Sequence, residues 1–360
     1  MAHNVFRQLE GERGIFKNEE ALSPEFLPER LPGREAQETD LAIALRPAAE
    51  GKRTANCFVY GPSGTGKTST CRHVIEQLKE YSGRTQCFYA NCWQHSTEQS
   101  LLSLMADKIG ALLPRRGLAS DEVFERLTQH FKAKKTVPIL VLDEADKLFF
   151  GGEYKILYRL SRAVEETGVP YGIVLVTNEE GLLARADQRI RSSLACKQIE
   201  FPQYSPAELK QILSYRAGMA LFDGSYDDDV IALCAGHGAK AGGDARAAVQ
   251  CLWLSAKNAE GKGREKITLE DVHKAIGKTL SSKEIKHERD EQALDEKLKN
   301  MLEIVASEEN GIEVTKLYEQ YAKKYGGGER SLRNYLRELE FKKFVKITPV
   351  REGYKLVEKI

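Results

Sequence analysis

The stretch GPSGTGKT (61–68) has the spacing G-x-x-x-x-G-K-T and lies between an apolar run and a helical pattern. Glycines at these positions let the backbone wrap around phosphate groups with its amides pointing inward. The positive end of the following helix, at residues 66–69, adds to this attraction. We therefore expect a nucleoside triphosphate site in which Lys67 binds the β- and γ-phosphates and Thr68 holds Mg²⁺.

Two adjacent acidic residues, Asp143 and Glu144, follow the apolar run ILVL (139–142). At a strand end beside a phosphate loop, Asp143 is expected to support Mg²⁺, directly or through water. Glu144 is expected to polarise the water that attacks the γ-phosphate. The alternative is a strand that merely ends in acids, and the phosphate loop favours the catalytic interpretation.

Further polar positions fit chemistry on a bound triphosphate. Asn178 ends the next apolar run and is expected to orient the water, although a strand-ending asparagine is usually a cap. Arg246, in GDAR (243–246), opens a helix and is expected to reach the phosphates; the alternative is a surface arginine. Arg189 and Arg191 precede the fifth apolar run. They either complete a neighbouring copy's site as an arginine finger or pair with acidic side chains.

These residues can act together only if the fold brings the ends of several strands close to one another. Apolar runs alternate with helical patterns, which is typical of a parallel sheet covered on both faces. The runs lie at 56–61, 86–92, 137–144, 171–178 and 196–202. Ser205 and Glu208 then form a capping-box pattern. It opens the first of four predicted helices, at 206–220, 226–236, 243–260 and 268–280. The fold class is therefore α/β, a nucleotide-binding parallel sheet followed by an all-helical domain.

The C-terminal region has the pattern of a DNA-binding module. Three helical patterns precede the strand patterns FVKITP (344–349) and GYKLVEK (353–359), which is the order of a winged helix. Residues 316–360 contain twelve Lys or Arg and six Glu. Arg330, Arg333 and Arg337 share a helical face suited to the major groove, and Lys346 and Arg351 lie in the hairpin. The alternative for the three helical arginines is a solvated surface.

The overall composition narrows the class of protein. The 360-residue chain has a formal net charge of +1, so any nucleic-acid partner must meet a local basic surface. No apolar run reaches the ~18 residues that a membrane span needs. Seven cysteines without C-x-x-C spacing indicate reduced thiols in a cytoplasmic protein. The predicted parts are a lead-in (1–34), a nucleotide-binding domain (35–203), a helical domain (204–280), a linker (281–294) and a winged helix (295–360).

Several segments resemble the AAA+ ATPases and, more closely, the archaeal replication initiators of the origin-recognition and cell-division-cycle-six type. These segments are IFKNEEALSPEFLPERLPGRE (15–35), LPRRGLASDEVFERL (113–127), VLDEADKL (141–148), FPQYSPAEL (201–209) and GDARAAV (243–249). The resemblance is more specific before residue 280 than after it. It implies a P-loop AAA+ domain, a helical lid domain and a C-terminal winged-helix domain.

The resemblance also implies site residues and partners. Contacts to ATP or ADP would come from Gly64, Thr65, Gly66, Lys67, Thr68 and Ser69, together with Tyr204 and Arg216. The lead-in would help enclose adenine, and Arg115 and Arg116 would belong to a helical insertion that touches DNA. The implied partners are double-stranded origin DNA on the nucleoid, the replicative helicase and other initiator subunits. We expect a slow, Mg²⁺-dependent ATPase that serves as a conformational switch.

Two other classes of protein share some of these features. A clamp-loader-like AAA+ subunit would end in a helical collar, which the winged-helix order at 295–360 disfavours. A nucleotide-sensing, DNA-binding transcription regulator fits the domain order. The initiator-like lead-in disfavours this second alternative.

Overall fold

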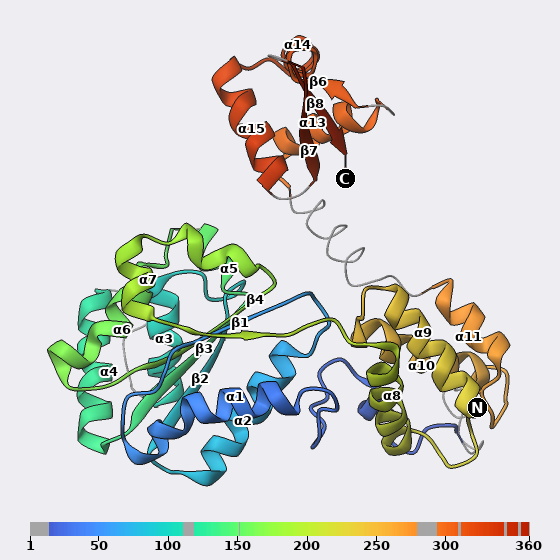
Figure 1. Cartoon of the computed structure of the whole chain (residues 1–360), viewed down its shortest axis with the longest axis horizontal. Helices are drawn as coiled ribbons and strands as arrows, with labels where there is room; N and C mark the ends of the chain where they lie inside the picture. The colour runs from blue at the N-terminus through green and yellow to red at the C-terminus, as the bar shows by residue number, and fades with distance from the viewer. Residues whose placement is uncertain are drawn as a thin grey trace, which may run out of the picture. The chain divides into compact units, whose positions relative to one another are not determined.

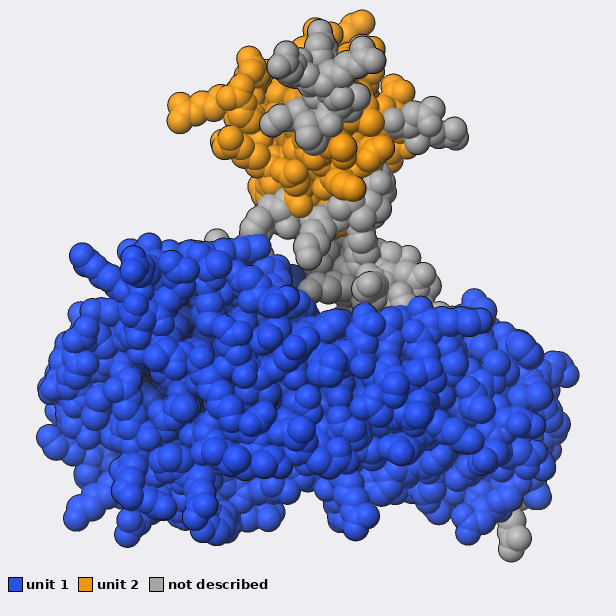
Figure 2. Space-filling view, viewed as in Figure 1, with its two compact units in different colours: residues 1–282 blue, residues 283–360 orange. Residues whose placement is uncertain are grey.

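The computed structural model describes residues 14–110, 119–150, 152–278, 294–308, 311–341, 344–351 and 354–359. Two compact units, Met1–Ser282 and Lys283–Ile360, divide the chain; Figure 2 colours them blue and orange. Among the described helices, none combines the length and the apolar character that crossing a membrane requires.

The first unit is built on a five-stranded parallel sheet in the order β2-β3-β4-β1-β5 (Figure 1). Its strands are β1 (Cys57–Tyr60), β2 (Thr85–Asn91), β3 (Val137–Asp143), β4 (Gly172–Thr177) and β5 (Lys197–Glu200). β3 and β4 are buried along their whole length, as continuous Val, Ile and Leu runs predict. The five expected strands are confirmed, and their carboxyl ends meet at one edge of the sheet.

Helices cover both faces of this sheet (Figure 1). On one face lie α1 (Glu35–Leu45) and α2 (Lys67–Tyr81), which share a core with β1, β3 and β4. The other face carries α3 (Glu98–Lys108), α4 (Ser120–Lys134), α6 (Lys155–Thr167) and α7 (Gln188–Leu194). Shorter elements are η3 (Arg46–Glu50), α5 (Asp146–Phe150) and η4 (Glu180–Arg185). All seven cysteines are free thiols.

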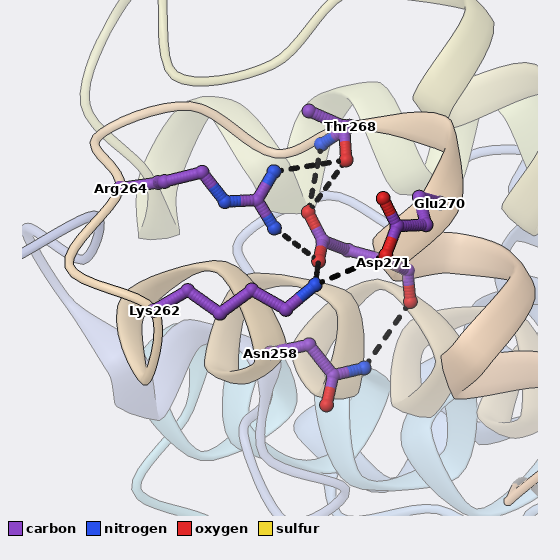
Figure 3. Close-up of polar contacts among 6 residues, drawn as sticks. All are labelled: Asn258, Lys262, Arg264, Thr268, Glu270 and Asp271. Atoms are coloured by element: carbon purple, nitrogen blue, oxygen red, sulfur yellow. Dashed lines mark hydrogen bonds and ion pairs between the residues drawn. The ribbon is translucent and has the colours of Figure 1, made fainter.

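Four helices with a core of their own follow the sheet, and we call them the lid. They are α8 (Pro206–Ala220), α9 (Asp228–Lys240), α10 (Ala245–Glu260) and α11 (Leu269–Ile276). The predicted capping box at α8 is present, because the amide of Glu208 donates to Ser205 Oγ and the amide of Ser205 donates to Glu208 Oε2. Figure 3 shows a second capping box at α11, in which Lys262 and Arg264 also contact the carboxylate of Asp271.

The lead-in strap, residues 14–33, packs on the lid. Phe16 pairs with Leu221 in an isolated bridge, and the amide of Phe222 donates to the carbonyl of Ile15. Ile15 and the short helix η2 (Glu19–Leu22) contribute apolar side chains to the lid core. The sequence predicted an irregular lead-in and did not predict this packing. Along the chain, the strap therefore packs against the lid before α1 of the sheet domain begins.

The second unit contains three helices and a small antiparallel sheet. The helices are α13 (Glu296–Ala306), α14 (Val314–Tyr325) and α15 (Glu329–Phe341); the strands are β6 (Ile312–Glu313), β7 (Val345–Arg351) and β8 (Tyr354–Lys359). The strands pair in the order β6-β8-β7, over a core shared with the helices. This confirms the predicted order of a winged helix. The two-residue strand β6 was not predicted, because so short a segment has no readable alternation.

Candidate functional site

The phosphate loop, residues 61–68, joins β1 to α2 at the carboxyl edge of the sheet. Gly64 and Gly66 both have left-handed backbone conformations, with φ of 76° and 87°. A Cβ atom added at Gly64 would overlap the carboxylate of Asp244, and one added at Gly66 would lie 2.6 Å from the hydroxyl of Tyr204. Both positions therefore require glycine, for the backbone conformation and for the close approach of neighbouring side chains.

Lys67 is the first residue of α2, and its side chain is buried beside the loop. Its ammonium donates to the carbonyls of Gly61 and Pro62, at 2.8 and 2.6 Å. These carbonyls hold the cation at the mouth of the loop, where a phosphate would be a stronger, charge-assisted acceptor. Thr65 and Ser69 flank it, and the Thr65 hydroxyl is engaged with the carbonyl of Pro62. The expected phosphate contact of Thr65 is therefore its backbone amide, since its hydroxyl bonds within the loop.

Thr68 and Asp143 converge next to this loop. The Thr68 hydroxyl donates to Asp143 Oδ2 at 2.8 Å, and the Tyr89 hydroxyl donates to the same oxygen. The amide of Glu144 donates to Asp143 Oδ1 at 3.0 Å. A hydroxyl and a carboxylate are oxygen ligands of the kind that Mg²⁺ prefers, so this pair fits a magnesium site. Burial, followed by the charge of Asp143, raises the pKa of Tyr89, which keeps it a neutral donor.

Glu144 and Asn178 lie together at the same sheet edge. Asn178 follows β4, and its side-chain amide is 3.4 Å from Glu144 Oε2. Glu144 has a φ of 54°, a left-handed conformation that costs a non-glycine residue about 1–3 kcal/mol. Backbone strain of this size collects at functional sites, where it aims a side chain. The structure thus brings together the carboxylate and the amide that the sequence predicted to handle the attacking water.

The lid meets the phosphate loop at the start of α10. The amide of Ala245 donates to the carbonyl of Gly64 at 3.1 Å. Asp244 caps the helix, because its Oδ1 accepts from the amides of Arg246 and Ala247. The side chain of Arg246 is exposed in this first turn. The positive end of α10 therefore lies beside the loop.

Tyr204 and Arg216 occupy the junction of sheet, lid and strap. Tyr204 is buried, and burial raises its pKa to about 12, with the Arg34 guanidinium acting in the opposite direction. Arg216 is also buried and donates to the carbonyls of Ser23 and Phe26, so it holds the lead-in strap to α8. Burial lowers the pKa of Arg216 to about 10. The nucleotide contacts assigned to these two residues stay predictions.

Two residues of this site were not predicted from the sequence. Tyr89 lies on β2 and holds the Asp143 carboxylate, and Arg34 contacts the phosphate loop directly. Arg34 stands in the segment LPGRE (31–35), whose position before α1 gave no sign of this contact. Tyr89 follows the alternating pattern of its strand and looked like an ordinary packing residue.

Four further arginines of the first unit were predicted to contact a neighbouring copy or DNA. Arg189 and Arg191 are both exposed on α7, where they are available to a neighbouring copy. Arg115 and Arg116 lie outside the described residues. The arginine-finger and DNA-contact roles of these four residues stay predictions.

In the second unit, α15 has a buried apolar face and an exposed face that carries three arginines and also acidic side chains. Leu332, Leu336 and Leu339 are buried, as predicted. Arg330, Arg333 and Arg337 are exposed, and so is Lys346 on β7. Arg351 ends β7, and only its backbone is described. A groove of about 710 Å³ runs between α14, α15 and β7. Arg333 and Arg337 line it together with Glu319, Glu329 and Glu340, and Arg333 donates to Glu329 Oε1 at 2.8 Å. The arginine-bearing face is therefore accessible to a partner.

Known proteins match the chain across both units. Residues 51–184 match the AAA domain family, and residues 210–277 match the Cdc6 AAA+ ATPase-type lid domain. The ORC1-type DNA replication protein 1 of Sulfurisphaera tokodaii is 38% identical over 263 residues, 72% of this chain and 66% of that protein. Its counterpart in Archaeoglobus fulgidus is 36% identical over 281 residues, 76% of this chain and 68% of that protein.

A solved structure matches nearly the whole chain. The structure of the Aeropyrum pernix ORC1 protein in complex with DNA aligns with a TM-score of 0.75 and 30% identity, over 96% of this chain and 94% of that chain. The chain spans about two thirds of the length of the curated relatives it matches, 66% for the Sulfurisphaera protein and 68% for the Archaeoglobus protein. With its P-loop sheet, its Cdc6-type lid and its winged-helix order, the chain belongs to the archaeal ORC1/Cdc6 family of AAA+ replication proteins.

Proposed function

We propose that this protein is an ATP-regulated initiator of DNA replication, which binds duplex origin DNA and helps to recruit or load the replicative helicase. The curated relatives are named as DNA replication proteins, and the Aeropyrum relative was solved in complex with DNA. The observation that carries the proposal is the hydrogen bond between Ala245 and Gly64, which joins the lid to the phosphate loop. A bound nucleotide can then influence the position of the lid.

The proposed ligand of the first unit is ATP or ADP with Mg²⁺. Bound Mg²⁺ would supply positive charge that stabilises the phosphates. The chain offers it the Thr68 hydroxyl and the Asp143 carboxylate, which lie 2.8 Å apart, with Tyr89 holding the carboxylate. Lys67 would exchange its carbonyl partners for the β- and γ-phosphates. The amides of residues 64–69 would supply the remaining contacts, as in other phosphate loops.

Hydrolysis is proposed to use Glu144 as the base that polarises the attacking water. Asn178 would hold the Glu144 carboxylate and orient the same water. Arg246 lies exposed on the lid and would neutralise phosphate charge only when the lid is closed. Arg189 or Arg191 of an adjoining copy is the proposed arginine finger. Because these cations arrive from a movable lid or from a second subunit, turnover is expected to be slow and to act as a switch.

The proposed DNA contact is the arginine-bearing face of α15, with the β7–β8 hairpin following the phosphate backbone; Arg333 would exchange its bond to Glu329 for a DNA contact. A helix that places three arginines on one face suits the major groove, where arginine reads guanine edges or phosphates. The winged-helix order of the second unit differs from the helical collar expected of a clamp-loader subunit. An initiator of this kind would act in the cytoplasm, on the nucleoid.

Footprinting of the full chain tests this function. We expect the protein to protect its own replication origin and to leave promoter DNA of similar length unprotected. We also expect the protected region to differ between ATP and ADP. Preferential protection of promoters would instead favour a transcription regulator. Co-precipitation with the replicative helicase of the same genome, with and without ATP, tests the proposed recruitment step separately.

A further inference from the structure

The guanidinium of Arg34 is enclosed between three segments of the chain. The residue is 1% exposed. Its Nε donates to the carbonyl of Thr65 at 2.8 Å, its Nη1 to that of Gly33 at 2.6 Å, and its Nη2 to that of Pro202 at 2.6 Å. The three carbonyls belong to the phosphate loop, the lead-in strap and the crossover from sheet to lid. Arg34 therefore connects the phosphate loop, the strap and the crossover.

Aromatic rings complete this enclosure. The Arg34 guanidinium carbon lies 3.7 Å from the centroid of the Tyr204 ring and 5.6 Å from that of Phe201. A planar guanidinium stacks on such rings and donates in a fixed fork, which an ammonium cannot do. Burying a cation is unfavourable unless its donors are paired. Here Nε, Nη1 and Nη2 each donate to a backbone carbonyl. The arrangement is thus specific for arginine.

The contact with Thr65 has a consequence for phosphate binding. The carbonyl of Thr65 and the amide of Gly66 belong to one planar trans peptide, so they point in opposite directions. Because Arg34 holds the oxygen, the amide of Gly66 is aimed away from the guanidinium. Amides at this position of a phosphate loop bind the phosphates. Arg34 therefore fixes the orientation of one phosphate-binding amide without touching the ligand.

The contact with Pro202 links this peptide to the movement of the lid. Residues 201–205 lead from β5 into α8, and they include Tyr204, whose hydroxyl lies beside Gly66. A lid rotation that displaced the carbonyl of Pro202 would break its bond to Arg34. A rearrangement of the loop that turned the carbonyl of Thr65 would break the other bond. Either change would therefore alter the position of the same guanidinium.

We propose that Arg34 is a positioning residue that couples phosphate binding at the Thr65–Gly66 peptide to the sheet-to-lid crossover at residues 201–205. This inference rests on the proposed nucleotide-binding function and adds to it the route by which the lid responds. The carbonyl-binding fork, and not positive charge alone, is the feature that the coupling requires. Arg34→Lys retains the positive charge but removes the forked set of donors. This variant therefore distinguishes the contribution of the fork from that of the charge.

The test compares Arg34→Lys and Arg34→Gln with Arg30→Gln, which changes an exposed arginine of the same strap. ADP affinity is measured by calorimetry, and the hydrogen exchange of the amides of residues 203–205 is measured with and without ADP. In the unaltered protein and in Arg30→Gln, ADP is expected to slow exchange at these amides. In both Arg34 variants we expect ADP affinity to fall about tenfold or more and the ADP-dependent slowing to be lost.

The outcomes separate this inference from the proposed function. If Arg34→Lys binds ADP and protects the crossover like the unaltered protein, the fork is not required and the inference is overturned. If the Arg34 variants melt at a lower temperature but keep both the ADP affinity and the protection, the role is structural only. If the unaltered protein binds neither ADP nor ATP, the proposed function itself is wrong, and the coupling falls with it.

Discussion

The backbone amide of Ala245, at the start of α10, donates a 3.1 Å hydrogen bond to the carbonyl of Gly64 in the phosphate loop. This bond joins residues that are far apart in the sequence. It places the positive end of a lid helix against the loop that is expected to hold phosphates. The lid therefore has a direct route by which to respond to the nucleotide, through the backbone and not only through the exposed side chain of Arg246.

Gly64→Ala is expected to weaken nucleotide binding. Alanine at φ 76° costs about 1–2 kcal/mol, and its Cβ would overlap the carboxylate of Asp244, which must then move. Since 1.4 kcal/mol corresponds to a factor of ten, we expect calorimetry to give an ATP affinity at least about tenfold lower. Gly83→Ala is the matched control, because a Cβ there meets no atom within 4 Å. Equal affinities for the two variants would contradict the close approach of lid and loop.

Glu144→Gln is expected to separate binding from hydrolysis. The amide keeps the size of the side chain but cannot accept a proton, so we expect ATP hydrolysis to fall about 100-fold or more while ATP affinity is retained. Phosphate release under single-turnover conditions measures the first quantity and calorimetry the second. Glu180→Gln is the control, since Glu180 is exposed in η4 at the same edge of the sheet. Undiminished hydrolysis in Glu144→Gln would remove this carboxylate from the chemistry.

Asp271→Asn is expected to destabilise the lid by about 2–4 kcal/mol, because the buried carboxylate joins two cations to the start of α11 (Figure 3). Burial acts to raise the pKa of Asp271. Hydrogen bonds from Thr268, Lys262 and Arg264 outweigh burial, so the pKa lies below its ordinary value. Glu270→Gln is the control, because Glu270 is exposed and bonds to Lys262 alone among these cations.

The pH dependence of this effect follows from the lowered pKa of Asp271. A carboxyl whose pKa is lower in the folded state contributes its full stability above its unfolded pKa of about 3.9. That contribution is lost as the pH falls through the folded pKa. Urea unfolding should therefore give a constant difference between Asp271→Asn and the unaltered protein at neutral pH. The difference should shrink below about pH 4, and a difference that persisted there would argue against an ionised Asp271.

The parts of the fold that follow from local patterns were predictable from the sequence. Apolar runs predicted the five strands. The runs were clearest for β3 and β4, because a strand buried on both faces admits few polar residues. Ser205 and Glu208 marked the start of α8 because a capping box is satisfied within four residues. The phosphate loop and the pair Asp143–Glu144 were predictable for the same reason, because each is a short motif at the carboxyl end of a strand.

Contacts between distant segments were not predictable in this way. The lead-in strap looked irregular, because its few apolar residues become buried only against a lid that begins near residue 206. Arg34 binds carbonyls, which carry no side-chain signature in the sequence. Tyr89 occupies a position where any large residue would satisfy the strand pattern. The structure identified all three by their partners.

Arg337→Ala is expected to weaken binding to duplex DNA. Arg337 is exposed on α15, on the face opposite to the buried leucines of this helix. If it contacts a phosphate, its loss should lower affinity about tenfold on all sequences and reduce the slope of log affinity against log salt by about one; a base contact would instead relax sequence preference. Fluorescence anisotropy of the full chain on origin DNA, from low to high salt, measures both quantities. Lys297→Ala on α13 is the matched control, because it removes an exposed positive charge from another helix of the same unit. Equal losses from the two variants would mean that net charge, and not the α15 face, determines DNA binding.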